Sequence, residues 1–200
     1  QAVVIVGDVD VDAMEQKLKT MFGKYQTPED SPNPSEYPLE MNPEPIFAYG
    51  SDKELSNTHF MVMNKFSLYD VGKVSVADSV YCEVVTAVIE IMLDWRVGKL
   101  LEAPDSPFAH LHKSIDGFFN SNSINVLAVV GLAYPGRELE AYRMVLATLQ
   151  EIRTCGFSES EFQKAVQVYL SRMEKCLAER NHVPNNTFCD FLTDNFVGGE

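Results

Sequence analysis

The sequence has no apolar run near the length of about 18 to 20 residues that a membrane-spanning helix requires, which excludes that class of protein. Basic residues are also scarce, with 16 Lys and Arg against 29 Asp and Glu and a formal net charge of −13. Such a charge repels phosphate, so nucleic acid and anionic membrane surfaces are excluded as partners. Basic peptides and other proteins remain compatible with it.

Cysteine is scarce as well, and no two cysteines form a C-x-x-C pair. The four, which are Cys82, Cys155, Cys176 and Cys189, are widely separated. Zinc ribbons and thioredoxin-type redox sites therefore lack their basic spacing. We expect unpaired, buried thiols, because free cysteine packs as a small apolar side chain. One structural disulfide is the alternative.

Catalytic signatures are missing too. Neither H-E-x-x-H nor H-x-x-E-H occurs, and there is no G-x-S-x-G elbow or phosphate-binding loop. His110 and His112 are the one close histidine pair, and on a strand both would project from the same face. A zinc site needs three or four ligands, which Glu102, Asp105 or Asp116 would have to complete. The residues thus predict no catalytic and no metal site, with His110 and His112 as weak candidates for metal ligands.

The first fifth of the chain reads as strand, helix and linker. Residues 2–6 are apolar and β-branched, as in a strand buried on both faces, and Gly7 then breaks the pattern. A helix is expected over 11–22, with Asp10 as its N-cap. Six prolines occupy residues 27–45, which indicates a connector within the domain rather than a helix or central strand. Because the chain starts inside an apparent core strand, we interpret it as an excerpt of a longer polypeptide.

The remaining elements follow from apolar periodicity and turn residues. Strands are predicted at 46–49 and 57–66, a long helix at 76–101, and a hairpin with arms at 108–119 and 123–134. An apolar stripe from Leu139 to Ile152 then predicts a helix that Gly156 ends. Ser158 and Glu161 form a capping box that opens another helix, and a last short helix is expected at 187–196. Strands and helices that do not alternate strictly predict an α+β fold, with a mostly antiparallel sheet covered by helices on one face.

Three stretches together resemble a known family. AVVIVGDVD at residues 2–10, followed by a helix that ends in MFGKY, resembles the opening "vvvvGdvd" strand and helix of the non-catalytic domain in the insulinase/pitrilysin family of zinc metallopeptidases. MLDWRVGKL at 92–100 resembles the end of that domain's long helix. CGFSESEF at 155–162 resembles the corner between its paired helices. The matches stand in the same order and span nearly the whole of residues 1–200, which predicts one such domain. The family includes the mitochondrial processing peptidases.

This resemblance implies what the chain lacks. In the family the zinc motif belongs to a separate catalytic domain, so zinc is expected there and no cofactor in this chain. Some partner domains hold the substrate with an Arg and a Tyr, whereas the matching residues 106–120 have neither and contain His110 and His112. No substrate-binding residue is therefore assigned. Gly7 and Gly156 are expected to serve backbone geometry, and Ser158 with Glu161 to cap a helix.

The leading hypothesis is a non-catalytic domain of a larger zinc metalloendopeptidase that helps to form the chamber around peptide substrates. The expected partners are other domains of the same polypeptide or a paired subunit, and the peptide itself. The alternative is a binding or assembly domain of a catalytically inactive homologue. An intact zinc motif elsewhere in the full-length protein would favour the first. The resemblance leaves the compartment open between bacterial envelope, mitochondrion and cytosol.

Overall fold

The computed structural model describes residues 2–26, 39–67, 75–120 and 124–198. The chain divides into two compact units, one of Gln1–Glu36 with Met173–Glu200 and one of Tyr37–Arg172. Whether residues 1–200 fold as one domain stays a prediction. Most of the predicted Pro-rich connector, residues 27–38, lies outside the described residues, and residues 39–45 form neither helix nor strand.

The unit that contains the N-terminal residues has only helices among its described elements. They are α1 (Val11–Phe22), the end of α4 (Glu159–Glu179), the short η2 (Arg180–His182) and α5 (Asn185–Gly198). The Asp10 carboxylate accepts a hydrogen bond of 2.9 Å from the Ala13 amide, so the predicted start of α1 is confirmed. The predicted helix at 187–196 is confirmed within α5, which extends beyond it at both ends.

Two predicted strands are wrong. Residues 2–6 form no strand, and Val3 and Ile5 are 55% and 41% exposed. The described part of their unit offers no other strand to satisfy their backbone N–H and C=O groups. Residues 46–49 also remain unpaired, and Tyr49 is 93% exposed. Both segments have strand-like composition, but a strand exists only where a neighbouring strand accepts its hydrogen bonds.

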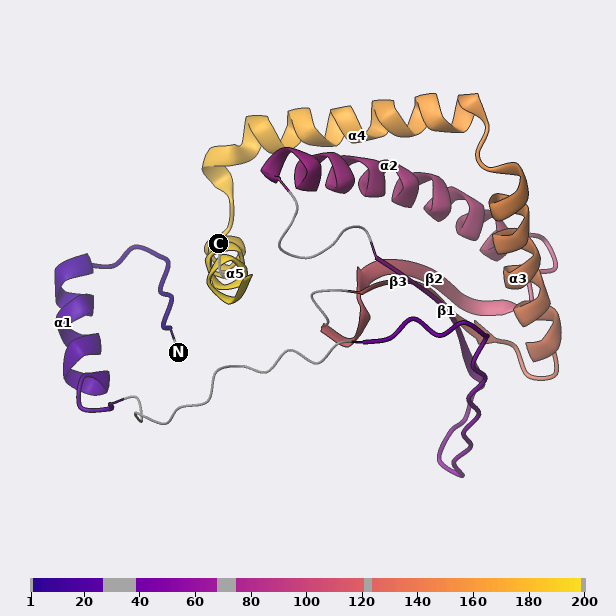
Figure 1. Cartoon of the computed structure of the whole chain (residues 1–200), viewed down its shortest axis with the longest axis horizontal. Helices are drawn as coiled ribbons and strands as arrows, with labels where there is room; N and C mark the ends of the chain where they lie inside the picture. The colour runs from indigo at the N-terminus through magenta and orange to yellow at the C-terminus, as the bar shows by residue number, and fades with distance from the viewer. Residues whose placement is uncertain (1, 27–38, 68–74, 121–123, 199–200) are drawn as a thin grey trace. The chain divides into compact units, whose positions relative to one another are not determined.

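The second unit is built on a three-stranded antiparallel sheet in the order β1–β3–β2 (Figure 1). The strands are β1 (His59–Phe66), β2 (Phe108–Gly117) and β3 (Asn125–Ala133). β2 and β3 pair antiparallel, which confirms the predicted hairpin, and the short η1 (Phe118–Asn120) follows β2. β3 is the central strand, so its backbone is hydrogen-bonded on both sides, whereas β1 and β2 each have one free edge among the described residues.

Two helices cover one face of this sheet. They are α2 (Val76–Leu101), whose predicted bounds are confirmed, and α3 (Glu138–Cys155). Val97 of α2 and Val145 of α3 pack with Leu111 and Val129 of the sheet in one apolar core. Val129, on the central strand, is only 1% exposed. The predicted α+β class, with helices over one face of an antiparallel sheet, is confirmed.

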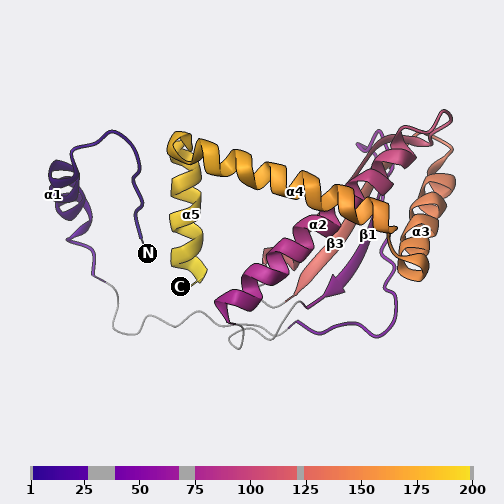
Figure 2. The same cartoon turned by 90° about the horizontal axis from the view of Figure 1, so that it is seen from above.

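The helix α4 forms a further layer, because α2 lies between it and the sheet (Figures 1 and 2). Ala165 of α4 packs against Val88, Ile91 and Met92 of α2 in a second apolar cluster. These α2 residues lie on the opposite side of the helix from Val97's contacts with the sheet. The helix is therefore apolar on more than one side, as expected for an element between two layers.

A single arginine ties the three long helices together. Arg96 of α2 donates from Nη1 to Glu151 of α3 at 3.1 Å and from Nη2 to Glu161 of α4 at 3.0 Å. Its Nε also lies 2.8 Å from the other Glu161 oxygen, which adds to the ion pair but is not aligned for a hydrogen bond. Glu161 is 16% exposed in its side chain, so solvent screens this contact less than an ordinary surface pair.

The capping box predicted at Ser158 and Glu161 is confirmed. The Ser158 amide donates to the Glu161 carboxylate at 2.9 Å, and the Glu161 amide donates back to the Ser158 hydroxyl at 3.3 Å. These hydrogen bonds from Ser158, with a further contribution from Arg96, lower the pKa of Glu161 to about 2. Gly156, which ends α3 just before this box, has a φ of 68°, a conformation that side chains with a Cβ rarely adopt.

The cysteine prediction is half right. All four thiols are unpaired, as expected, but Cys155 and Cys176 are exposed and Cys82 and Cys189 are only partly covered. The predicted burial is wrong because an apolar helical pattern does not show whether another element packs against it. No helix within the described ranges is both long and apolar enough to cross a membrane.

A neighbouring aromatic ring leaves no room for a Cβ atom at position 131. Gly131 of β3 pairs with Phe60 of β1, and a Cβ built on Gly131 would collide with the Phe60 ring. That ring cannot move freely, because its centroid lies 5.9 Å from the Tyr142 ring and 6.3 Å from the Phe108 ring. We expect Gly131→Ala to lower the free energy of unfolding, measured in urea, by about 1–3 kcal/mol.

The matched control is Gly98→Ala in α2, where an added Cβ meets no atom within 4 Å. That change should raise stability by about 0.5–1 kcal/mol, since alanine favours a helix over glycine. Equal effects of the two substitutions would contradict the proposed ring contact.

The low pKa of Glu161 predicts a specific dependence of stability on pH. The folded-state pKa of about 2 lies below the ordinary value of 4.5, so the carboxylate stabilises the fold above pH 4.5. This contribution is lost as the pH falls from 4.5 through about 2. Glu161→Gln should cost about 1–2 kcal/mol at neutral pH and weaken the pH dependence across that window.

The control for this prediction is Glu159→Gln. Glu159 lies in the same first turn of α4 but contacts Gln163 rather than Arg96 or Ser158. Denaturant unfolding of both variants between pH 2 and pH 7 separates the capping contact from the general effect of charge at the helix start. An unchanged pH profile in Glu161→Gln would show that the cap and ion pair do not contribute.

Candidate functional site

The face of the sheet that α2 and α3 leave uncovered carries an exposed row of side chains, which we call the open face. It is defined by His59, Met61 and Met63 of β1, Val130 and Leu132 of β3, and His110 and His112 of β2. The register places these residues on one side, since alternate residues such as Phe60, Leu111 and Val129 point into the core.

Cross-strand pairing sets the order of side chains on the open face. Leu132 lies between His59 and His110, and Val130 lies between Met61 and His112. Met61 and Met63 are 49% and 43% exposed, whereas Val130 and Leu132 are half-buried between their neighbours. The open face therefore has an apolar centre with histidines along both edge strands.

A contact with the segment before β1 marks one end of the open face. The Lys65 Nζ donates to the backbone carbonyl of Glu40 at 3.0 Å and lies 5.3 Å from the centre of the Phe118 ring. Lys65 pairs with Val126 of β3, at the end of the open face opposite to His59. Val126 is buried at this end, whereas Met61 and Met63 remain exposed.

The two predicted candidate ligands lie together on this face. The ring centroids of His110 and His112 are 5.2 Å apart, with 41° between their planes. An irregularity in the register between Phe108 and His110 lets the strand bury Phe108 and still present both histidines on the open face. The sequence spacing alone predicted the shared face, and the structure adds the distance.

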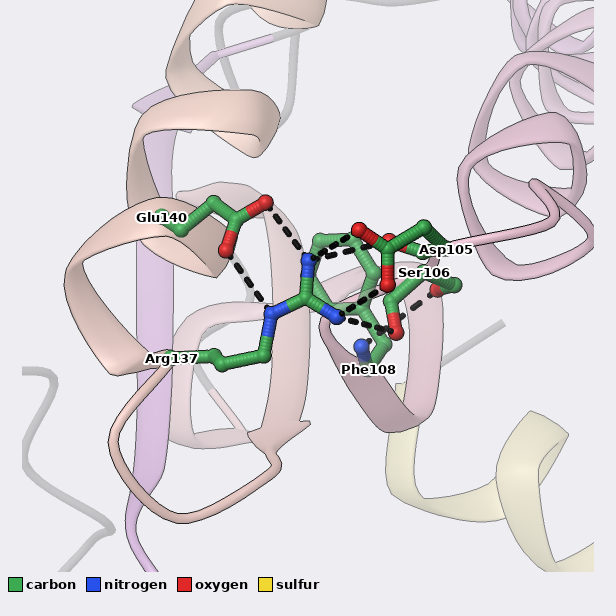
Figure 3. A network of polar contacts seen from close by, with 5 residues as sticks. All are labelled: Asp105, Ser106, Phe108, Arg137 and Glu140. Atoms are coloured by element: carbon green, nitrogen blue, oxygen red, sulfur yellow. Dashed lines mark hydrogen bonds and ion pairs between the residues drawn. The ribbon is translucent and has the colours of Figure 1, made fainter.

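None of the acidic residues considered as further ligands joins the pair in a cluster. Asp105 is held by Arg137, whose Nη1 donates to Asp105 Oδ1 at 2.9 Å and whose Nη2 donates to Glu140 at 2.7 Å (Figure 3). Asp116 accepts from the Gly117 amide at 2.9 Å. Across residues 2–26, 39–67, 75–120 and 124–198, no three His, Cys, Asp or Glu side chains are grouped to hold a metal ion.

The network around Arg137 is structural. Arg137 stands at the start of α3 and also donates to the Ser106 carbonyl, so it joins that helix to the loop before β2 (Figure 3). Hydrogen bonding to Glu140 and Asp105 raises the pKa of Arg137, and the same contact lowers the pKa of Glu140. The contacts of Arg137 with Asp105, Ser106 and Glu140 fix how α3 begins beside the sheet.

An acidic groove lies on the opposite side of the sheet, between the first half of α2 and the ends of β2 and β3. Its volume is about 300 Å³. It is lined by Ser79, Cys82, Glu83, Thr86, Ala87, Glu90, Ile115, Asp116, Gly117 and Asn125. Lys113, whose side chain is 7% exposed, lies under α2 and pairs with Glu90 at 3.1 Å and Asp94 at 3.5 Å. The lining side chains include three acids and no base.

None of the four residues predicted to have structural roles is part of the open face. Gly156, Ser158 and Glu161 form the corner between α3 and α4. Gly7 lies before α1 with a φ of 156°. The sequence reasoning did not identify Met61, Met63, Val130 and Leu132 as surface residues of interest. Their alternation with Phe60 and Val129 was a readable signal, but it does not reveal which side the helices cover.

Two solved structures with a similar fold are of the same protein. The chain superimposes on the periplasmic protease PqqL from Escherichia coli with a TM-score of 0.70 at 13% identity, covering 96% of this chain and 21% of that one. The first half of PqqL gives a TM-score of 0.68 at 12% identity, with coverage of 96% and 40%. The chain thus spans about a fifth of the length of PqqL. No curated protein matches the sequence.

A family model described as the inactive domain of peptidase M16 matches residues 1–169. This match covers most of the chain and includes the sheet and the start of α4. It agrees with the resemblance seen in the sequence, since the family resembled there was the non-catalytic domain of insulinase-type peptidases. The chain therefore belongs to the peptidase M16 family, as its inactive domain.

Proposed function

We propose that the chain is the non-catalytic domain of a larger zinc-dependent metalloendopeptidase, and that its open face helps to line a chamber that encloses peptide substrates. The family match and the similarity to the periplasmic protease PqqL support the peptidase part of this proposal. The coverage of only 21% of PqqL supports a role beside other domains of the same polypeptide.

The observation that carries the chamber role is the exposure of apolar side chains on the open face. The apolar side chains of a sheet are normally covered by other parts of the protein. A contiguous apolar patch that stays exposed commonly marks an interaction surface. Here the helices cover one face, and Met61 and Met63 project from the other. Methionine adapts its shape to different partners, which suits a wall that meets peptides of varied sequence.

The net charge of the chain indicates which class of peptide it would attract. The chain has a net charge of −13. A protein of this charge attracts cationic peptides and repels anionic ones. Peptides that combine basic and apolar residues would therefore match both the charge and the open face.

Zinc and the hydrolytic step are assigned to another domain. The sequence contains neither H-E-x-x-H nor H-x-x-E-H, the arrangements that place two imidazoles and a general base at one ion. This chain would supply binding and enclosure, while the domain that holds the metal activates the water that attacks the peptide bond.

Replacing the methionines tests the chamber role in the full-length protein. Met61→Gln with Met63→Gln removes apolar contact area without changing charge. If the open face binds the peptide equally in the ground and transition states, KM for a basic, apolar peptide should rise about three- to tenfold with little change in kcat. Steady-state kinetics of the wild type and the double variant measure this.

Leu170→Gln is the matched control, because Leu170 of α4 is exposed to a similar extent, 47%, and lies away from the sheet. It should leave KM unchanged. An equal rise in both variants, or no rise in either, would contradict a peptide surface on the open face. Peptide binding without any turnover in the full-length protein would instead support the alternative, a binding domain of an inactive homologue.

The isolated 200-residue chain should not hydrolyse peptides, with or without added zinc. The reason is the lack of a general base beside a metal-binding group in the described residues. Incubation with an unstructured peptide and analysis by mass spectrometry checks this. Turnover that is abolished by His110→Asn or His112→Asn would contradict the assignment of catalysis to another domain.

A further inference from the structure

His110 and His112 form a pair with no other assigned task. Both side chains are exposed on the open face, and among the described residues they contact only each other's rings. A histidine that serves packing is normally covered or hydrogen-bonded. These two rings are neither, so both are available to bind a ligand.

The distance between the rings is what one shared metal ion would require. A metal–nitrogen bond of about 2.0–2.1 Å places the ion about 3.2 Å from the centre of each imidazole ring. At a tetrahedral angle, two such rings have their centres about 5.2 Å apart. The observed separation of the His110 and His112 centroids is 5.2 Å.

The rings can also turn toward a shared ion. The χ2 torsion of histidine has a broad energy profile, and no hydrogen bond to another described residue fixes either ring. Neutral imidazole is the commonest metal ligand in proteins and suits Zn²⁺, Cu²⁺ and Ni²⁺. The backbone of β2 holds the two Cβ atoms on one side of the strand, so little conformational entropy is lost when the second ring binds the ion.

We propose that His110 and His112 form a two-imidazole chelate for a divalent late transition-metal ion on the open face. No third ligand is supplied by the described residues, since Asp105 and Asp116 are engaged elsewhere. The remaining coordination positions are filled by water or by donor groups of a bound peptide. Affinity follows the Irving–Williams order, so Cu²⁺ binds more tightly than Zn²⁺ or Ni²⁺.

Isothermal titration of the 200-residue chain with Cu²⁺ and with Zn²⁺ tests this site. Because a chelate needs both rings, His110→Asn and His112→Asn should each weaken binding of either ion by at least about tenfold. The double variant should be little worse than either single variant, since one imidazole alone is a weak ligand. Additive losses or unchanged affinities would overturn the chelate.

His59→Asn is the matched control, because His59 is an exposed histidine on the same open face but lies across Leu132 from His110. It should bind both ions as the wild type does. Loss of affinity in this variant equal to that in His110→Asn would show nonspecific binding to surface histidines and would overturn the proposal.

A spectroscopic measurement identifies the ligands independently of affinity. Electron paramagnetic resonance of the chain with one equivalent of Cu²⁺ should show two imidazole nitrogens bound in the wild type and in His59→Asn. It should show fewer than two in either variant at position 110 or 112. A spectrum that is unchanged by both of those substitutions would place the ion elsewhere and contradict the assignment.

Discussion

The burial of one face of a three-stranded sheet under α2 and α3 is the constraint on which the rest of the second unit depends. Val129 on the central strand is almost completely buried. Ala141 and Val145 of α3 belong to the same apolar cluster and are buried to the same extent. This burial supplies the apolar stabilisation that holds three strands together, because a small sheet is not stable by itself. It also determines the function we propose. Once the helices cover one face, the alternation of the strands leaves every second side chain on the other.

The helical layers are held by charge as well as by apolar packing. Arg96 joins α2, α3 and α4 through Glu151 and Glu161, and the same Glu161 caps the helix on which it lies. One carboxylate thus fixes the start of α4 and its position over α2. Removing it would leave the guanidinium of Arg96 partly covered with one partner fewer, which costs more than the loss of an exposed ion pair. The corner between α3 and α4 is therefore both a turn, made by Gly156, and an electrostatic junction.

Local signals explain which elements could be predicted from the sequence. The bounds of α1 followed from apolar periodicity and the Asp10 cap, and those of α2 followed from its apolar stripe. The box of Ser158 and Glu161 was readable as a motif because its hydrogen bonds join residues three apart. Residues 2–6 and 46–49 were misjudged, since β-branched composition does not state whether a partner strand is present. The open face was not predicted, because the period of two separates the faces without showing which one the helices cover. The spacing of His110 and His112 indicated a shared side of β2, but the ring separation depends on tertiary structure.

The central claim is that the open face meets peptide in the full-length protein, and its methionines report on this directly. Hydroxyl-radical footprinting with mass spectrometry measures oxidation of Met61 and Met63 with and without a basic, apolar peptide, while Met173 on α4, which is 42% exposed, serves as the internal reference. The account predicts that bound peptide protects Met61 and Met63 and leaves Met173 unchanged. Equal oxidation of Met61 and Met63 in the free and peptide-bound protein would contradict it.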